Sequence, residues 1–142
     1  MIKKFTATVT IEINADAAAV WKALTDPAII KQYFFGTNVV TDWKKGSPIY
    51  FRGEWEGKAY EDKGTILDIA PEKFVQYNYW SSMSGTPDLP EHYATIRYEL
   101  TRKGTMTVLS IVQDGIASEE QIKHSEENWR LVIGGMKKLV EG

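Results

Sequence analysis

The sequence predicts an α+β fold in which helices cover one face of a curved antiparallel sheet. Three features of the 142-residue chain indicate this class. An alternating first strand is followed by two short helical segments, the middle of the chain alternates between strand patterns and turn residues, and a long amphipathic segment comes last. The expected sheet has about six or seven strands, and the chain length suits one domain over residues 1–142.

The first strand is expected at residues 5–13, where apolar and polar side chains alternate. The apolar set is Phe5, Ala7, Val9, Ile11 and Ile13. Asp16 is a suitable N-cap for a helix in which Ala17, Val20, Trp21 and Leu24 recur at helical spacing. Asp26 can cap a second short helix, because Pro27 needs no amide donor at the first helical position. Two short helices therefore follow the first strand.

The middle region, from Gly36 to Asp114, is typical of antiparallel strands joined by tight turns. The turns are expected at "KKGS", "WEGK", "APEK" and "RKGT", which carry glycine or proline. One connection is much longer than a hairpin turn, and we expect its residues 81–91 to act as a lid.

The C-terminal helix is expected from Glu119 to Val140. Ser118 and Gln121 form a capping-box pair at its start. An apolar stripe is expected opposite the charged residues Glu126, Glu127, Arg130 and Lys137; it consists of Ile122, Trp129, Val132, Ile133, Met136 and Leu139. Gly134 and Gly135 interrupt the helix at a cost of about 1 kcal/mol each, so the helix either approaches a strand closely or bends there.

Composition excludes several function classes. The chain has 17 basic and 19 acidic residues, a formal net charge of −2, so it lacks the positive field that nucleic acids require. It has no cysteine, which excludes disulfides and thiolate chemistry. No signal peptide or membrane-spanning stretch is present, so we expect a cytoplasmic protein without membrane insertion.

Three stretches resemble one known family. "INADAAAVWKALTDP" is similar to its N-terminal signature, "GSPIYFRGEWEGKAYEDKGTILDIAPEKFVQYNYWS" to its glycine-spaced strands, and "ENWRLVIGGMKKL" to its closing helix. The family is the group related to the C-terminal domain of the activator of the heat-shock chaperone ATPase, within the START-like, polyketide-cyclase-like superfamily. The resemblance covers nearly the whole chain. It implies a helix-grip fold, in which a bent sheet wraps around the long last helix and often leaves an apolar cavity.

What the resemblance implies about function is broad, because members range from lipid and hormone carriers to aromatic cyclases. Two departures from the family pattern matter. Many relatives have tryptophan where this chain has Tyr33, so we expect the entrance of any pocket to have a different shape here. The eukaryotic chaperone activators also carry a separate N-terminal domain, which does not fit into this chain, so we expect no chaperone partner.

Amphipathic rings are the candidate ligand-binding residues. Five Trp and seven Tyr are more than a dry core needs, and rings with a few polar groups typically line small-molecule sites. The alternative for each ring is ordinary core packing. The candidates are Tyr33, Phe34, Trp43, Phe51, Trp55, Tyr77, Tyr79, Trp80, Tyr98 and Trp129, with Ile133 and Met136 on the last helix.

The sequence gives less evidence for catalysis than for ligand binding. His92 is the one candidate general base, because strand alternation gives it the parity of Ala94, Ile96 and Tyr98. His124 is expected on the solvated side of the last helix. The acidic residues around "WEGK" are interpreted as cross-strand charge pairs on a solvated face; they are Glu54, Glu56, Glu61 and Asp62. No cluster with metal-ligand spacing, hydrolase elbow or phosphate loop is present, so we expect no metal and no cofactor.

Three functions follow from these observations. The leading hypothesis is a module that binds an apolar, aromatic or lipid-like small molecule in a cavity between the sheet and the last helix. The second is a cyclase- or hydrolase-type enzyme that uses the same cavity. The third is a chaperone cofactor or protein-interaction domain. The sequence leaves a homodimer open.

Overall fold

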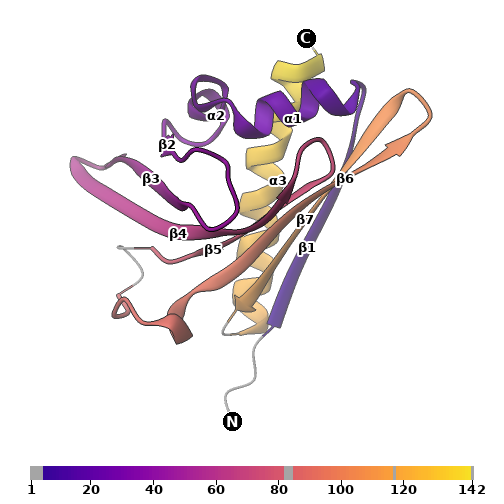
Figure 1. Ribbon diagram of the computed structural model, residues 1–142. Coiled ribbons are helices and arrows are strands. Elements are labelled where there is room, and N and C mark those ends of the chain that lie inside the picture. The colour runs from indigo at the N-terminus through magenta and orange to yellow at the C-terminus, as the bar shows by residue number, and fades with distance from the viewer. Residues whose placement is uncertain (1–4, 82–84, 117, 142) are drawn as a thin grey trace.

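A computed structural model describes residues 5–81, 85–116 and 118–141, except for the side chain of Trp55. In these described residues, seven antiparallel strands form one curved sheet, and three α-helices lie on it (Figure 1). The strand order is β1-β7-β6-β5-β4-β3-β2. The elements are β1 (Phe5–Ile13), α1 (Ala17–Thr25), α2 (Pro27–Tyr33), β2 (Asn38–Val40), β3 (Pro48–Trp55), β4 (Lys58–Ala70), β5 (Phe74–Tyr79), the 3₁₀ helix η1 (Pro90–His92), β6 (Ala94–Lys103), β7 (Met106–Ile116) and α3 (Glu119–Glu141). The expected α+β class and element order are confirmed.

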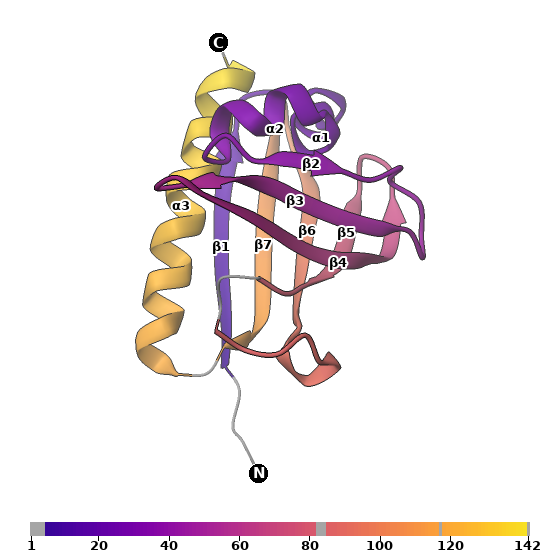
Figure 2. The same ribbon diagram turned by 90° about the vertical axis from the view of Figure 1, so that its left-hand side faces the viewer.

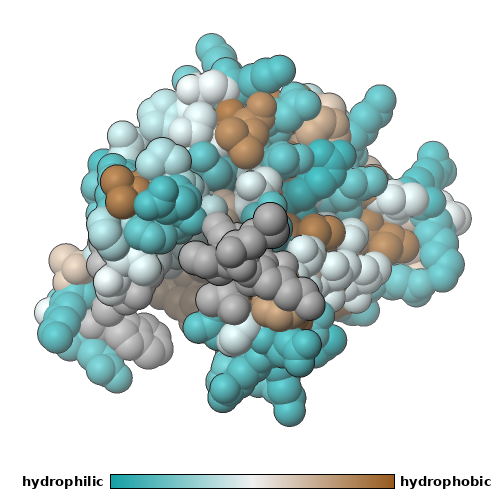
Figure 3. Space-filling view, turned by 90° about the horizontal axis from the view of Figure 1, so that it is seen from below, coloured by the Kyte–Doolittle hydropathy of each residue, from teal (hydrophilic) through white to brown (hydrophobic). Residues whose placement is uncertain are grey.

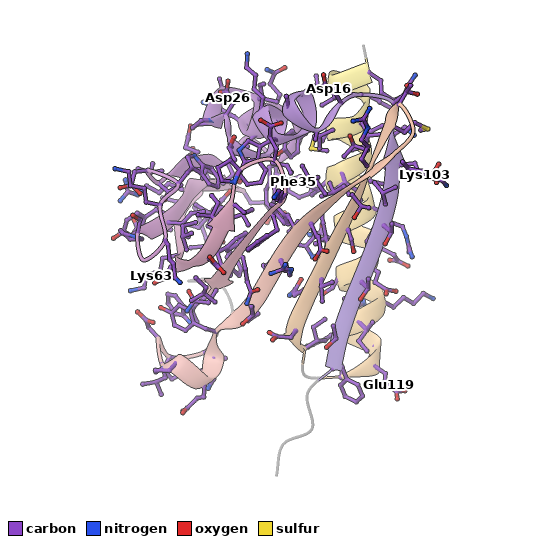
Figure 4. The ribbon with its side chains drawn as sticks, turned by 45° about the vertical axis from the view of Figure 1, so that its right-hand side comes forward. Asp16, Asp26, Phe35, Lys63, Lys103 and Glu119 are labelled. Atoms are coloured by element: carbon purple, nitrogen blue, oxygen red, sulfur yellow. The ribbon has the colours of Figure 1, made fainter. Side chains whose placement is uncertain are left out.

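The two short helices begin where the sequence predicts. The carboxylate of Asp16 accepts a hydrogen bond from the Ala19 amide at 2.8 Å, and that of Asp26 accepts one from the Ala28 amide at 2.9 Å. Both acidic residues lie at the starts of their helices (Figure 4). Each cap satisfies an amide that has no partner inside its helix. These local contacts set where α1 and α2 begin above the sheet.

The sheet bends sharply along β4. Figure 2 shows β3 and β4 crossing in front of β1, β7 and β6 instead of running alongside them. The first part of β4 pairs with β3 as far as Thr65, and pairing with β5 begins at Ile66. At Gly64 the backbone of the two strands is so close that a Cβ atom would lie 1.7 Å from the carbonyl oxygen of Asn78. Only glycine permits this approach.

Helix α3 runs across the concave side of the sheet and packs against β1 and β7. Ser118 Oγ accepts a hydrogen bond from the Gln121 amide at 3.2 Å, which confirms the expected start of the helix. Its buried stripe is Trp129, Val132, Ile133 and Met136, whereas Leu139, which was expected in the stripe, is 45% exposed. Core side chains from the sheet and the two short helices surround this stripe. In the described part of the chain, no helix is both long and apolar enough to cross a membrane.

Gly134→Ala is expected to stabilise the protein by up to about 1 kcal/mol, because alanine has a higher helix propensity and restricts the unfolded chain. A Cβ atom at Gly134 would meet nothing within 4 Å, so nothing in the fold opposes the substitution. Urea unfolding of both proteins measures the change. Gly135→Ala is the control and should gain less, because its Cβ would lie 3.4 Å from the Cβ of Tyr33. A loss of stability in Gly134→Ala would contradict the prediction.

Candidate functional site

An open pocket of about 570 Å³ lies where α3 approaches the bent part of the sheet. Its walls come from the end of α2 and the following connection, from β3, β4 and β5, and from α3. The lining residues are Phe34, Phe35, Thr37, Phe51, Tyr60, Asp62, Tyr79, Asn128 and Leu131. Residues from separate parts of the chain therefore meet here because the sheet bends toward the helix.

The apolar part of the pocket is built around Phe34. Its ring packs edge-on against Phe35 and Trp129, each at a centroid distance of 6.1 Å, and lies 6.5 Å from Phe51. The rim is formed by Phe35 and by Leu131 of α3, which expose 48% and 66% of their surface. Large apolar side chains exposed around a hollow are typical of a binding site.

Phe35 has an unusual backbone conformation. Its φ is +55°, in the left-handed region that costs a non-glycine residue about 1–2 kcal/mol. Gly36 follows with φ +74°, and the two residues turn the chain from α2 toward β2. Strain of this kind persists where the surrounding structure imposes it. The turn holds the Phe35 ring on the rim of the pocket instead of in the core.

The polar part of the pocket is centred on Asp62, which is only 7% exposed. Its carboxylate accepts hydrogen bonds from the Tyr79 hydroxyl at 2.5 Å and from Ser81 Oγ at 3.0 Å. Burial, together with the hydrogen bond to Asp62, raises the pKa of Tyr79 far above its ordinary value. Tyr79 therefore stays a neutral donor at neutral pH.

A second polar pair closes the pocket beside Asp62. Thr37 Oγ1 and the Tyr60 hydroxyl form a hydrogen bond of 2.6 Å. The Tyr60 ring reaches across to the neighbouring strand over Gly53, where a Cβ atom would lie only 2.5 Å from the hydroxyl oxygen. The missing side chain at Gly53 thus makes room for this ring, and the ring brings its hydroxyl to Thr37.

The interpretation of Asp62 as part of a solvated acidic face is wrong. Glu56 and Gly57 both have positive φ and form a two-residue turn, which pairs Trp55 with Lys58 and therefore Phe51 with Asp62. Directly paired residues share a face of the sheet, so Asp62 points inward with Phe51. The turn sequence carried this register signal. The interpretation holds for Glu61, which is exposed and forms an ion pair of 2.6 Å with Arg52.

An inner void of about 20 Å³ lies behind the open pocket, between the two short helices and the sheet. It has room for about one water molecule. Phe34 and Phe51 line both spaces and form the partition between them. The candidate residues Tyr33, Trp43, Tyr77 and Tyr98 line the void. The space found between sheet and helices is thus divided into an open outer part and a nearly filled inner part.

The inner tyrosines are hydrogen-bonded within the protein. The hydroxyls of Tyr77 and Tyr98 lie 2.8 Å apart, and the Tyr33 hydroxyl donates to the Ala23 carbonyl at 2.8 Å. Burial raises the pKa of all three phenols, so each keeps its proton at neutral pH. Across the described side chains, no fully buried nitrogen or oxygen atom lacks a partner.

The remaining candidate residues lie apart from the open pocket. Trp129, Ile133 and Met136 are buried in the core, and the indole of Trp129 donates a 2.7 Å hydrogen bond to Gln113. Trp80 is on the opposite face of the sheet from Tyr79, where its ring stacks on Tyr93. The side chain of Trp55 lies outside the described residues.

His92 does not continue the strand alternation, because it ends the 3₁₀ helix η1 before β6 begins at Ala94. The prediction that His92 lies on the same strand face as Ala94 and Ile96 is therefore wrong. Its Nδ1 lies 2.8 Å from the Pro87 carbonyl oxygen, and His92 does not line the open pocket. His124 is exposed on α3, as expected.

The connection after β5 was expected to form a lid at residues 81–91, but residues 82–84 lie outside the described residues. The described remainder is tied to the outer face of the sheet. Lys63 forms a 2.5 Å ion pair with Asp88, and this contact lowers the pKa of the Asp88 carboxyl. Within the described ranges, no group of three His, Asp or Glu side chains could hold a metal ion.

The end of the molecule seen from below is mostly hydrophilic. Apart from atoms drawn in grey, its apolar residues form separate small patches (Figure 3). The open pocket carries the exposed apolar side chains of Phe35 and Leu131, which favour an apolar ligand.

Comparisons with known proteins agree with this fold. The family model "Activator of Hsp90 ATPase homolog 1-like protein" matches residues 14–141. The solution structure of ChR145 from Cytophaga hutchinsonii is 47% identical, with a TM-score of 0.87, over 99% of this chain and 96% of that chain. Protein CV1439 from Chromobacterium violaceum is 20% identical, with a TM-score of 0.78, over 96% and 97% of the two chains.

A further similar structure is the Aha1 dimer from Colwellia psychrerythraea. It is 16% identical, with a TM-score of 0.75, and 96% of each chain is covered. At this identity the similarity shows the fold alone. A comparison with curated proteins gives no match.

Proposed function

The chain belongs to the activator of Hsp90 ATPase homolog 1-like family, and we propose that it is a module that binds a small apolar or aromatic molecule in the open pocket. The observation that carries this proposal is the composition of the pocket. Exposed Phe35 and Leu131 form an apolar rim, and buried Asp62 provides a polar end. Small-molecule sites are typically lined by apolar rings with a few placed polar groups.

The volume of the pocket also supports the proposal. Ligand sites commonly measure about 300–1,000 Å³, and the open pocket has about 570 Å³. The inner void of about 20 Å³ holds no such molecule while Phe34 and Phe51 keep their places. The ligand therefore binds on the outer side of this partition, and the ligand contacts predicted for the deeper rings require the partition to open.

The other predicted roles have less support from the site. His92 lies outside the pocket lining, so its role as a general base stays a prediction. A chaperone or other protein partner, a homodimer and a cytoplasmic location also stay predictions. The similar Colwellia protein is described as a dimer.

Leu131→Ser is expected to weaken binding of the neutral fluorescent probe N-phenyl-1-naphthylamine about tenfold, because the rim loses an apolar side chain that would be buried against the probe. The measurement is the rise in probe fluorescence during titration with protein. Leu131 is 66% exposed, so the unfolding midpoint should barely change.

The matched control is Leu139→Ser, which alters a 45% exposed leucine on the same helix. Leu139 lines a different hollow, beside α1 and α2, and its loss should leave probe affinity unchanged. Equal effects of the two substitutions, or no binding of the probe to the parent protein, would refute the proposed function.

A further inference from the structure

The charge found in the pocket lining is negative. Among the residues found to line it, Asp62 is the one carboxylate, and Lys, Arg and His are absent. The other polar groups of the lining are hydroxyls and the amide of Asn128, which carry no charge at neutral pH. A ligand that enters the pocket therefore meets a negative charge at its polar end.

The position of Asp62 makes this charge effective. Its residue is only 7% exposed, and its carboxylate accepts hydrogen bonds from the hydroxyls of Tyr79 and Ser81, among its contacts. A charge removed from water is screened less, so it acts strongly on a second charge brought near it. A carboxylate only accepts hydrogen bonds, so the group that it favours in a ligand is a donor.

The described cations on β3 and β4 near Asp62 point away from it or lie exposed. Arg52 and Lys63 alternate with the inward-facing residues and point to the outer face, where they pair with Glu61 and Asp88. Lys58 is on the same face of β4 as Asp62, but it lies exposed at the hairpin tip, four residues away. Water and salt screen an exposed charge at that separation.

We propose that the pocket selects its ligands by charge: it binds apolar molecules whose polar end donates hydrogen bonds, ammonium compounds most tightly, and it discriminates against carboxylates such as fatty acids. This inference rests on the proposed function and narrows its ligand class. Asp62 is the specificity-determining residue, and the apolar rim contributes affinity that does not depend on charge.

The test uses three probes with one ring system: 2-naphthylmethylamine, 2-naphthylmethanol and 2-naphthoate. Isothermal titration calorimetry at pH 7 gives their dissociation constants. The expected order of affinity is ammonium, then alcohol, then carboxylate, with the ammonium compound binding at least about tenfold more tightly than the carboxylate.

Asp62→Asn removes the charge and keeps the shape and an accepting oxygen. The ratio of the dissociation constant of 2-naphthoate to that of 2-naphthylmethylamine should therefore fall toward one. Asp68→Asn is the matched control, since it changes the net charge equally at an exposed position on the same strand. Its ratio should equal that of the parent protein.

Three results would overturn the inference. They are a parent protein that binds 2-naphthoate as tightly as the amine, a ratio that Asp62→Asn leaves unchanged, and an equal loss of selectivity in Asp68→Asn. If Asp62→Asn does not fold, the dissociation constants of the parent protein for the three probes still test the inference. Failure of the proposed function is distinguishable, because then neither these probes nor neutral N-phenyl-1-naphthylamine binds.

Discussion

Gly64→Ala is expected to destabilise the protein by about 3 kcal/mol or more, the largest effect of any substitution considered. The added Cβ atom would lie 1.7 Å from the carbonyl oxygen of Asn78 and 2.6 Å from its carbonyl carbon. Both are backbone atoms of β5, which cannot rotate away as a side chain can. To remove this clash, β4 and β5 must separate where the sheet bends toward α3. The Thr65 amide donates a 2.7 Å hydrogen bond to Asn78 Oδ1 at this place.

Chemical unfolding of the parent and variant measures this loss through the shift of the denaturant midpoint. Gly53→Ala is the control on the paired strand, because its Cβ would meet only the ring end of Tyr60. That ring can move, so the expected loss is about 1 kcal/mol, together with a changed pocket wall. A Gly64→Ala protein within about 1 kcal/mol of the parent would mean that the strands do not approach this closely.

The second large effect is expected at the buried tyrosine pair. Tyr77→Phe or Tyr98→Phe should each cost about 1–3 kcal/mol, because each removes one hydroxyl and leaves the other buried without its partner. The two oxygens lie 2.8 Å apart, and the rings pack edge-on at 5.6 Å. Phenylalanine keeps the ring contact and removes only the polar group.

The double variant should lose less than the sum of the two single losses, because it leaves no unpaired hydroxyl behind. A double-mutant cycle from urea unfolding gives the coupling energy, expected at about 1 kcal/mol or more. The control pair is Tyr77→Phe with Tyr33→Phe, since the Tyr33 hydroxyl donates to Ala23 instead. Additive losses at Tyr77 and Tyr98 would show that the two hydroxyls do not depend on each other.

Much of the fold was predictable from local patterns. The caps at Asp16 and Asp26, the alternation in β1 and the apolar stripe of α3 each involve residues that are close together in the chain. The physics of these signals is equally local, since a cap or a helical face needs only a few neighbouring positions. The predicted start of α3 at Glu119 coincides with the observed one.

The site was predictable only in part. Of the residues that the sequence predicts to bind a ligand, Phe34, Phe51 and Tyr79 line the open pocket, and their contact with a ligand stays a prediction. Asp62 was assigned to the wrong face, although the two-residue turn at Glu56 and Gly57 implied the correct register. The other lining residues have no distinguishing local pattern; they are Phe35, Thr37, Tyr60, Asn128 and Leu131.

The order of the elements, and which side chains are apolar on each, follow from local patterns, because hydrophobic periodicity and capping act over a few residues. Where space remains depends on how the elements pack together. The bend at Gly64 and the packing of Phe34 between Phe51 and Trp129 separate an open pocket from a nearly filled core. A hollow depends on how closely elements that are distant in the sequence approach one another. The size of a single side chain can open or close it, and no local sequence pattern shows this.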